Sequence, residues 1–117
     1  MLHGKKAKKF GREGSVRVAL LRGLAISLIK NGKIQTTEAK AKELRKFVEP
    51  LVTIAKKGDV ASRRLVASKL GNNEIETKKL VSEIAPKFKE VPGGYTRIIK
   101  LKTRLKDAAN MAVIEFV

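Results

Sequence analysis

The stretch that decides the fold runs from Ile34 to Lys57 and reads IQTTEAKAKELRKFVEPLVTIAKK. Thr36 or Thr37 can cap a helix with a side-chain oxygen, and Glu38 places a carboxylate in the first turn, where the helix dipole favours it. Apolar residues then recur at spacings of three and four: Ala41, Leu44, Val48, Leu51 and Ala55. This pattern predicts one long amphipathic helix that packs on a hydrophobic core.

The composition is strongly basic. The 117 residues, enough for one domain, include 27 Lys and Arg against 11 Asp and Glu, which gives a net charge of +16. Such an excess repels itself in a compact chain and calls for a polyanion, of which nucleic acid comes first and an anionic membrane second. The charge therefore predicts the kind of partner and says nothing about the fold.

Several classes of chemistry are excluded or disfavoured by what the sequence lacks. There is no Cys, so disulfides, thiolate zinc sites and a cysteine nucleophile are excluded, and the single histidine, His3, argues against Ser-His catalysis. No phosphate-binding glycine motif, close carboxylate pair, bilayer-length apolar run or secretory signal is visible. We predict no enzyme activity, metal, cofactor, small-molecule substrate or membrane contact.

Other elements follow from periodicity and turn signals. Ser15 to Lys30 predicts a helix closed by Asn31-Gly32, with an inward face of Val18, Leu21, Ala25, Leu28 and Ile29. Two shorter helices follow Gly58-Asp59: Val60 to Leu70 with Leu65, Val66 and Leu70 inward, then Glu74 to Ala85 with Ile75, Leu80, Val81 and Ile84 inward, ended by Pro86. Alternation from Tyr95 to Lys102 and a β-prone run from Met111 to Val117 predict two strands, and Ile34 supplies a third.

These elements predict an α+β fold. A small mixed sheet of about three strands, with a carboxy-terminal hairpin, packs against several helices in a single globular domain of residues 15–117. Residues 1–14 differ, because they combine three glycines with a group of basic side chains and little periodicity: Lys5, Lys6, Lys8, Lys9 and Arg12. We expect a flexible basic tail that becomes ordered on a polyanion, the alternative being a solvated tail without a partner.

Two internal patterns could bind phosphate. Thr36, Thr37, Lys40 and Lys42 surround the start of the central helix, where backbone N–H groups and the positive dipole end can hold an anion. The alternative is that the threonines only cap the helix and the lysines are solvated. Arg17 on the preceding helix and the adjacent Arg63 and Arg64 are further candidates, or simply solubilising charge.

The second pattern is PGGYTR at residues 92–97. Gly94 lets backbone approach a phosphate closely, Tyr95 can stack on an unpaired base, and Arg97 can grip phosphate with two hydrogen bonds. The alternative is a turn that needs a positive φ, followed by a tyrosine of the core. Because few aromatic residues are present, we expect phosphate and shape contacts to dominate over base stacking.

Residues at several spacings carry a family resemblance. In the central stretch they are Ile34, Thr36, Lys40, Ala41, Lys42, Glu49, Leu51, Thr53 and Lys56, joined by ASRRLVAS at 61–68, NNEI at 72–75 and GGYTRIIKL at 93–101. Along nearly its whole length the chain resembles the bacterial family of large-subunit ribosomal protein seventeen. The resemblance implies a structural component of the large ribosomal subunit that binds and stabilises folded rRNA beside neighbouring ribosomal proteins.

Carried over position by position, the resemblance implies rRNA contacts at His3, Lys5, Lys9, Arg12, Thr36, Thr37, Lys40, Lys42, Arg63, Arg64, Gly94, Tyr95 and Arg97. It also implies a cytoplasmic ribosome, although an organellar one would suit the same sequence. The alternative that the charge supports equally is a DNA-binding nucleoid or packaging protein, which would show an exposed arm or recognition helix and a symmetric dimer. An RNA-processing enzyme is disfavoured by the missing histidines, cysteines and clustered acids.

Overall fold

The protein is described by a computed structural model that covers the backbone of residues 2–117 and the side chains of residues 14–117. Helix α1 (Leu2–Asn31) leads into strand β1 (Lys33–Thr37) and the central helix α2 (Glu38–Ala55). Helices α3 (Val60–Lys69) and α4 (Glu74–Lys79) follow, continued by a π turn η1 (Leu80–Ile84) and a 3-10 turn η2 (Ala85–Phe88). Strands β2 (Thr96–Lys100) and β3 (Met111–Phe116) end the chain.

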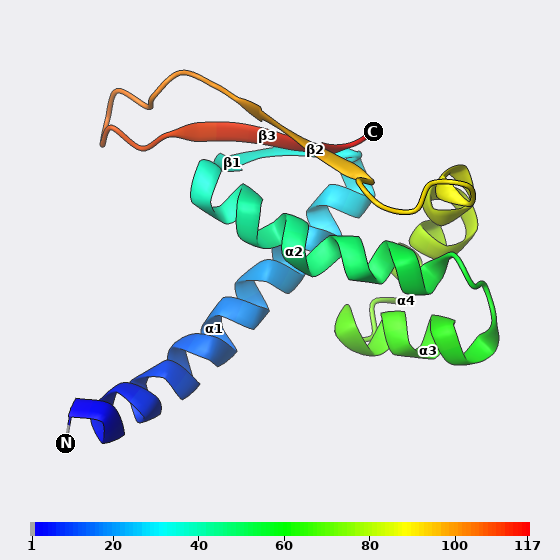
Figure 1. Cartoon of the computed structure of the whole chain (residues 1–117), viewed down its shortest axis with the longest axis horizontal. Coiled ribbons are helices and arrows are strands. Elements are labelled where there is room, and N and C mark those ends of the chain that lie inside the picture. The colour runs from blue at the N-terminus through cyan, green and yellow to red at the C-terminus, as the bar shows by residue number, and fades with distance from the viewer. Residues whose placement is uncertain (1) are drawn as a thin grey trace.

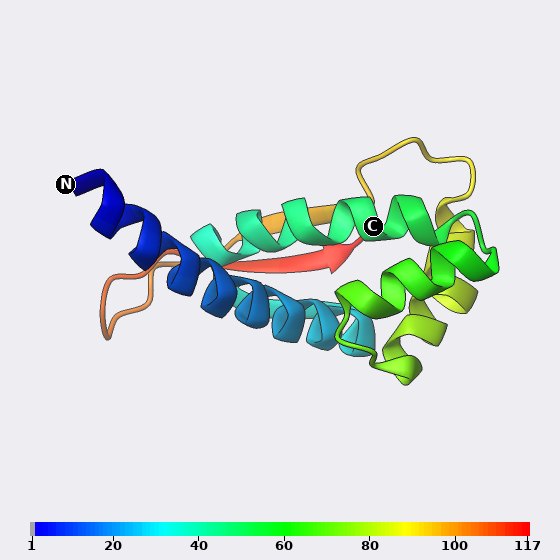
Figure 2. The same cartoon turned by 90° about the horizontal axis from the view of Figure 1, so that it is seen from below.

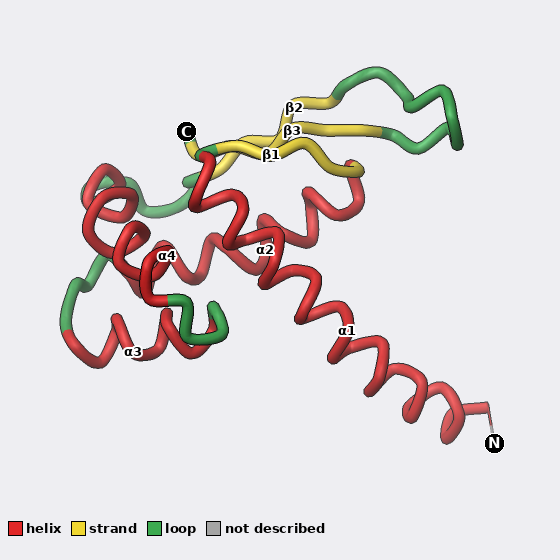
Figure 3. Tube along the Cα trace, turned by 180° about the vertical axis from the view of Figure 1, so that it is seen from behind, coloured by secondary structure: helices red, strands yellow, loops and turns green. Residues whose placement is uncertain are grey.

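The predicted α+β fold is confirmed, with the three strands in the order β1-β3-β2. Helices α1 and α2 cross beneath one face of the sheet, and the opposite face is bare of any element that the structure describes (Figure 1, Figure 3). Both pairings are antiparallel, with Ile34 opposite Ile114 and Ile98 opposite the same residue. The prediction of a mixed sheet is therefore wrong, because every pairing is antiparallel. Strands β1 and β2 run in the same direction, but β3 lies between them.

The central helix is built as its sequence predicts. Thr37 caps it by accepting a hydrogen bond from the Lys40 backbone N–H at 3.3 Å, whereas Thr36 is buried in β1. The five predicted core residues of α2 are all buried, and they pack with Ala25, Leu28 and Ile29 of α1 in a single cluster. The core therefore lies where α1, α2 and the sheet meet, and it extends to buried residues of α3, η1 and η2.

Three residues predicted to face inward are exposed: Val18, Leu65 and Ile75, the last with 81% of its surface accessible. In α3 the buried line is Ser62, Val66 and Leu70, four residues apart, and Leu65 falls beside it. Ile75 precedes the buried Thr77 by two positions, which places it on the opposite side of the helix. Val18 lies two turns before Ala25, the first buried residue among the described side chains of α1.

Two helix boundaries also differ from prediction. The helix expected from Ser15 is the second half of α1, which begins at Leu2. The helix expected to end at Pro86 instead tightens into η2, where a proline near the first position loses no hydrogen bond. The domain boundary at residue 14 stays a prediction, and the tail side chains lie outside the described part of the chain.

A carboxylate fastens the sheet to the central helix. Glu49 accepts hydrogen bonds from the backbone N–H of Tyr95 and from the Thr96 hydroxyl, each at 3.1 Å. Tyr95 and Thr96 are 1% and 2% exposed, so neither donor can turn to water if the carboxylate is lost. Glu49 therefore fixes the start of β2 against helix α2.

Replacing Glu49 by alanine should lower the free energy of unfolding by about 2 kcal/mol, because two buried donors lose their acceptor. Glu49→Gln keeps one acceptor and should cost roughly half as much. Urea denaturation measures both values. Glu43→Ala is the matched control on the same helix, where the carboxylate is exposed and we expect a change within about 0.5 kcal/mol; equal losses at the two positions would contradict the role given to Glu49.

Candidate nucleic-acid interface

Positive charge on the described surface is mostly not neutralised within the chain. Five ion pairs form among the side chains of residues 14–117, and their cations are Arg17, Lys42, Arg97, Lys100 and Arg104. The other lysines and arginines of this range make no ion pair with a described side chain. The surface therefore keeps a large positive excess, although it is unevenly distributed.

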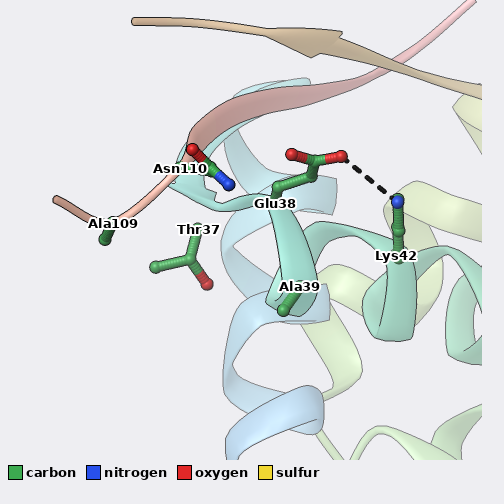
Figure 4. A pocket seen from close by; sticks show the side chains of 6 residues that line it. All are labelled: Thr37, Glu38, Ala39, Lys42, Ala109 and Asn110. Carbon is green, nitrogen blue, oxygen red and sulfur yellow. Dashed lines mark ion pairs between the residues drawn. The ribbon is translucent and has the colours of Figure 1, made fainter. Parts of the chain in front are cut away.

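The start of α2 is less open to an anion than its sequence suggests. The Glu38 backbone N–H donates to the Asn110 carbonyl at 2.8 Å, and the Lys40 N–H donates to Thr37, so two of the first three N–H groups have partners. Glu38 and Lys42 line a pocket at this helix start, and Figure 4 shows the Glu38 carboxylate directed at the Lys42 ammonium. It pairs with Lys42 at 3.2 Å and with Lys100 at 3.5 Å.

These contacts change the role of the helix start. Hydrogen bonding from Lys42, followed by the charge of Lys100, lowers the pKa of Glu38, so the carboxylate stays ionised at neutral pH. A phosphate approaching this helix end meets that negative charge first. Lys40, which is exposed and outside the ion pairs, remains the cation best placed to bind phosphate here.

Arg17 lies at the same end of the molecule. Its guanidinium is 3.9 Å from the Glu43 carboxylate of α2, with about half of each side chain exposed, so the pair is weak. The structure thus brings Arg17, Lys40 and Lys42 to one end of the α1 and α2 pair. Candidates His3, Lys5, Lys6, Lys8, Lys9 and Arg12 have side chains outside the described part of the chain.

Tyr95 is a residue of the core, which corrects the stacking role predicted for it. Its ring is 1% exposed and packs edge to face on Phe88 at a centroid distance of 5.3 Å. Its hydroxyl lies 3.1 Å from the Thr53 hydroxyl and accepts a hydrogen bond from the Lys56 ammonium at 3.0 Å. The bond from Lys56, then that from Thr53, lowers the pKa of Tyr95. A buried ring cannot stack on a base, so the alternative interpretation holds.

The rest of the PGGYTR segment is at the surface. Gly94 has φ of +67°, and a Cβ built there would meet open space, so the residue is required by the turn and not by packing. Arg97 points away from the helices on the bare face of the sheet and pairs with Glu115 at 2.7 Å. Because Tyr95 lies against the second half of α2, this segment is roughly 20 Å along the helix from Lys40.

Arg63 and Arg64 line a groove between α3 and α4 with a volume of about 360 Å³. Lys78 of α4 adds a third cation, while Glu74 lines the same groove and reduces its charge. Sequence reasoning missed Lys78, because its position depends on how the turn at Gly71 and Asn72, both with positive φ, folds α4 back on α3. The candidate residues thus form separate basic areas rather than one cavity.

No group of three or more His, Cys, Asp or Glu side chains within the described range could hold a metal ion. Among the helices that the structure describes, none is long and apolar enough to cross a membrane.

Fold and surface together define a small basic α+β protein with its cations distributed over several faces, a form suited to a large polyanion.

Comparison with known proteins narrows this class. A family model described as "Ribosomal protein L17" matches residues 20–117. The chain is 57% identical over 118 residues to the large ribosomal subunit protein bL17 of Persephonella marina, covering 100% of this chain and 95% of that one. It is 56% identical over 117 residues to bL17 of Campylobacter concisus and 54% identical over 120 residues to bL17 of Nautilia profundicola, in both cases with 100% and 98% covered.

The chain belongs to the ribosomal protein L17 family. It is accordingly a structural component of the large subunit of the bacterial cytoplasmic ribosome and not an enzyme. The family resemblance in the sequence is thereby confirmed. The alternative of a DNA-packaging protein has no support in these comparisons.

Proposed function

We propose that the chain stabilises folded rRNA of the large subunit through phosphate and shape contacts made by several separate basic areas, beside neighbouring ribosomal proteins. The areas are the tail, the α1 and α2 end with Arg17 and Lys40, the groove of Arg63 and Arg64, and the surface around Gly94 and Arg97. Cations on three or more faces suit an RNA that surrounds the domain better than a duplex lying along one face.

The observation that carries this proposal is the arginine pair on α3. Arg63 and Arg64 are exposed, make no ion pair with a described side chain, and share a groove with Lys78. Guanidinium groups bind phosphate with two parallel hydrogen bonds, and two adjacent ones can hold consecutive phosphates. A pair that served only for solubility would gain nothing from lining a groove with a third cation.

The test is binding of the full chain to large-subunit rRNA, small-subunit rRNA and duplex DNA at rising salt. We expect tighter binding to large-subunit rRNA at every salt concentration, because shape complementarity adds to the common electrostatic attraction. Equal affinity for all three polyanions would overturn the proposal, since charge alone would then account for binding.

Arg63→Ala/Arg64→Ala should leave the fold intact and reduce the slope of log K against log salt by about 1.4 to 1.8, the value for two lost phosphate contacts. Lys87→Ala/Lys89→Ala removes the same charge from the exposed surface around η2 and is the matched control. We expect the control to change the slope by less than half as much. Thermal unfolding of both variants confirms that binding, and not folding, is affected.

A further inference from the structure

The connection between β2 and β3 forms an ordered arm that extends beyond the sheet. The Leu101 N–H donates to the Met111 carbonyl, and the Arg104 N–H donates to the Ala109 carbonyl, each at 2.8 Å. Between them the Thr103 hydroxyl donates to the Asn110 side chain at 3.3 Å. These bonds continue the ribbon past the last strand residues, so the arm is a defined structure and not a slack loop.

The end of the arm is closed by a salt bridge. Arg104 makes two hydrogen bonds to the Asp107 carboxylate, at 2.8 and 2.7 Å, and the Ala108 N–H donates to the Arg104 carbonyl at 2.8 Å. Ala108 has φ of +56°, a conformation that a residue with a Cβ adopts rarely. A conformation that is locally unfavourable yet held by these three hydrogen bonds points to a tip shaped for a partner.

The side chains at the tip combine one apolar group with free cations. Leu105 is 103% exposed, so its side chain packs against no side chain in the described part of the chain. Lys106 follows it directly and Lys102 precedes it by three positions, and neither lysine makes an ion pair with a described side chain, whereas Asp107 is engaged by Arg104. The arm therefore carries an exposed leucine and two exposed lysines that no described carboxylate neutralises.

The position of the arm links it to the basic end of the molecule. The arm, the start of α2 and the amino-terminal half of α1 all extend toward the same end of the long axis (Figure 1, Figure 2). At the base of the arm, Ala109 and Asn110 line the pocket that also holds Thr37 and Lys42 (Figure 4). An RNA bound beside the start of α2 would therefore also lie next to the base of the arm.

We infer that residues 101–110 form an rRNA-binding arm, in which Lys102 and Lys106 contact phosphates and Leu105 packs against a ribose or an unpaired base. This inference rests on the proposed function and adds to it an element that sequence patterns and the family match do not indicate. Structured RNA is the occupant because the two cations have no acidic neighbour left to neutralise them, and apolar side chains on arms commonly pack into nucleic-acid grooves.

The first experiment compares full chains that differ only in the arm. Lys102→Gln/Lys106→Gln should bind large-subunit rRNA on the order of tenfold more weakly, with a salt slope reduced by about 1.4 to 1.8. Lys57→Gln/Lys89→Gln is the charge-matched control, with both lysines exposed near the opposite end of α2. Because all four side chains are at the surface, thermal unfolding should be unchanged in both variants.

The second experiment identifies what the tip touches. The chain has no Cys, so Leu105→Cys gives a single attachment point for an iron chelate that releases hydroxyl radicals. We expect cleavage of large-subunit rRNA at a discrete site when the labelled chain is assembled into the subunit. Cleavage of a neighbouring protein only, or arm variants that bind rRNA as tightly as the unchanged chain, would overturn the arm and leave the proposed function standing. Failure of the unchanged chain to bind large-subunit rRNA would overturn both.

Discussion

Replacing Tyr95 by alanine should lower the free energy of unfolding by about 3 to 5 kcal/mol, the largest loss we expect from any single substitution in this domain. The ring is fully enclosed, packs on Phe88, and lies 5.0 Å from the Lys56 ammonium. Its removal would leave a cavity at the junction of α2, η2 and β2 and strip Thr53 and Lys56 of a shared partner. Urea denaturation of the variant and of the unchanged chain, each followed to full unfolding, gives the difference in the free energy of unfolding.

Tyr95→Phe separates the structural role from an RNA-contact role. Phenylalanine keeps the ring and loses only the hydroxyl, so the free energy of unfolding should fall by about 1 to 2 kcal/mol while rRNA affinity stays within twofold. A base-stacking tyrosine would behave differently, because its alanine variant would fold normally and bind weakly. A Tyr95→Ala chain with near-normal stability and reduced rRNA affinity would therefore restore the stacking hypothesis.

The sequence predicts much of the fold because its strongest signals are local. The α2 stretch carries a cap, a charged first turn and a regular apolar face, and Thr37 and the five core residues lie where these signals place them. Alternation predicts β2 and β3 to within two residues at each end. Pairing of β1 with β3 is harder to predict, because more than seventy residues separate Thr37 from Met111 and only the folded core brings them together.

What the sequence does not predict depends on contacts between elements. Ile75 and Leu65 fit an apolar pattern within their own helices, yet the buried line is set by how α3 and α4 meet. Glu49 looks like a surface charge of α2 until Tyr95 and Thr96 are placed beside it. Short helices carry too few turns to fix their orientation from periodicity alone.

In the candidate interface too, the sequence predicts some features correctly and misses those that depend on contacts between elements. Residue type and net charge correctly indicate a basic surface, but accessibility decides which candidates can touch RNA. Thr36 and Tyr95 fit a phosphate or stacking motif and are buried, whereas Lys78, Lys102 and Lys106 belong to no motif and are exposed in basic areas. Glu38 illustrates the electrostatic part, because a good helix cap signal also places a negative charge where an anion was expected.

The amino-terminal segment should supply the largest share of rRNA affinity. Replacing Lys5, Lys6, Lys8, Lys9 and Arg12 by glutamine removes five candidate phosphate contacts and should reduce the slope of log K against log salt by about 3.5 to 4.5. At physiological salt this corresponds to a loss of affinity on the order of a thousandfold. Binding to large-subunit rRNA over a range of salt concentrations measures both quantities.

The body of the domain should fold without these charges, because Ala25 is the first buried side chain of α1 in the described range and the core lies beyond it. The control removes five exposed cations from the body, Lys46, Lys57, Lys69, Lys87 and Lys89, and so lowers the net charge equally. If the tail anchors the protein, the tail variant loses far more slope than the control, since only contacts that release counterions enter the slope. If the two variants lose the same amount, rRNA responds to total charge, and the tail has no special place in binding.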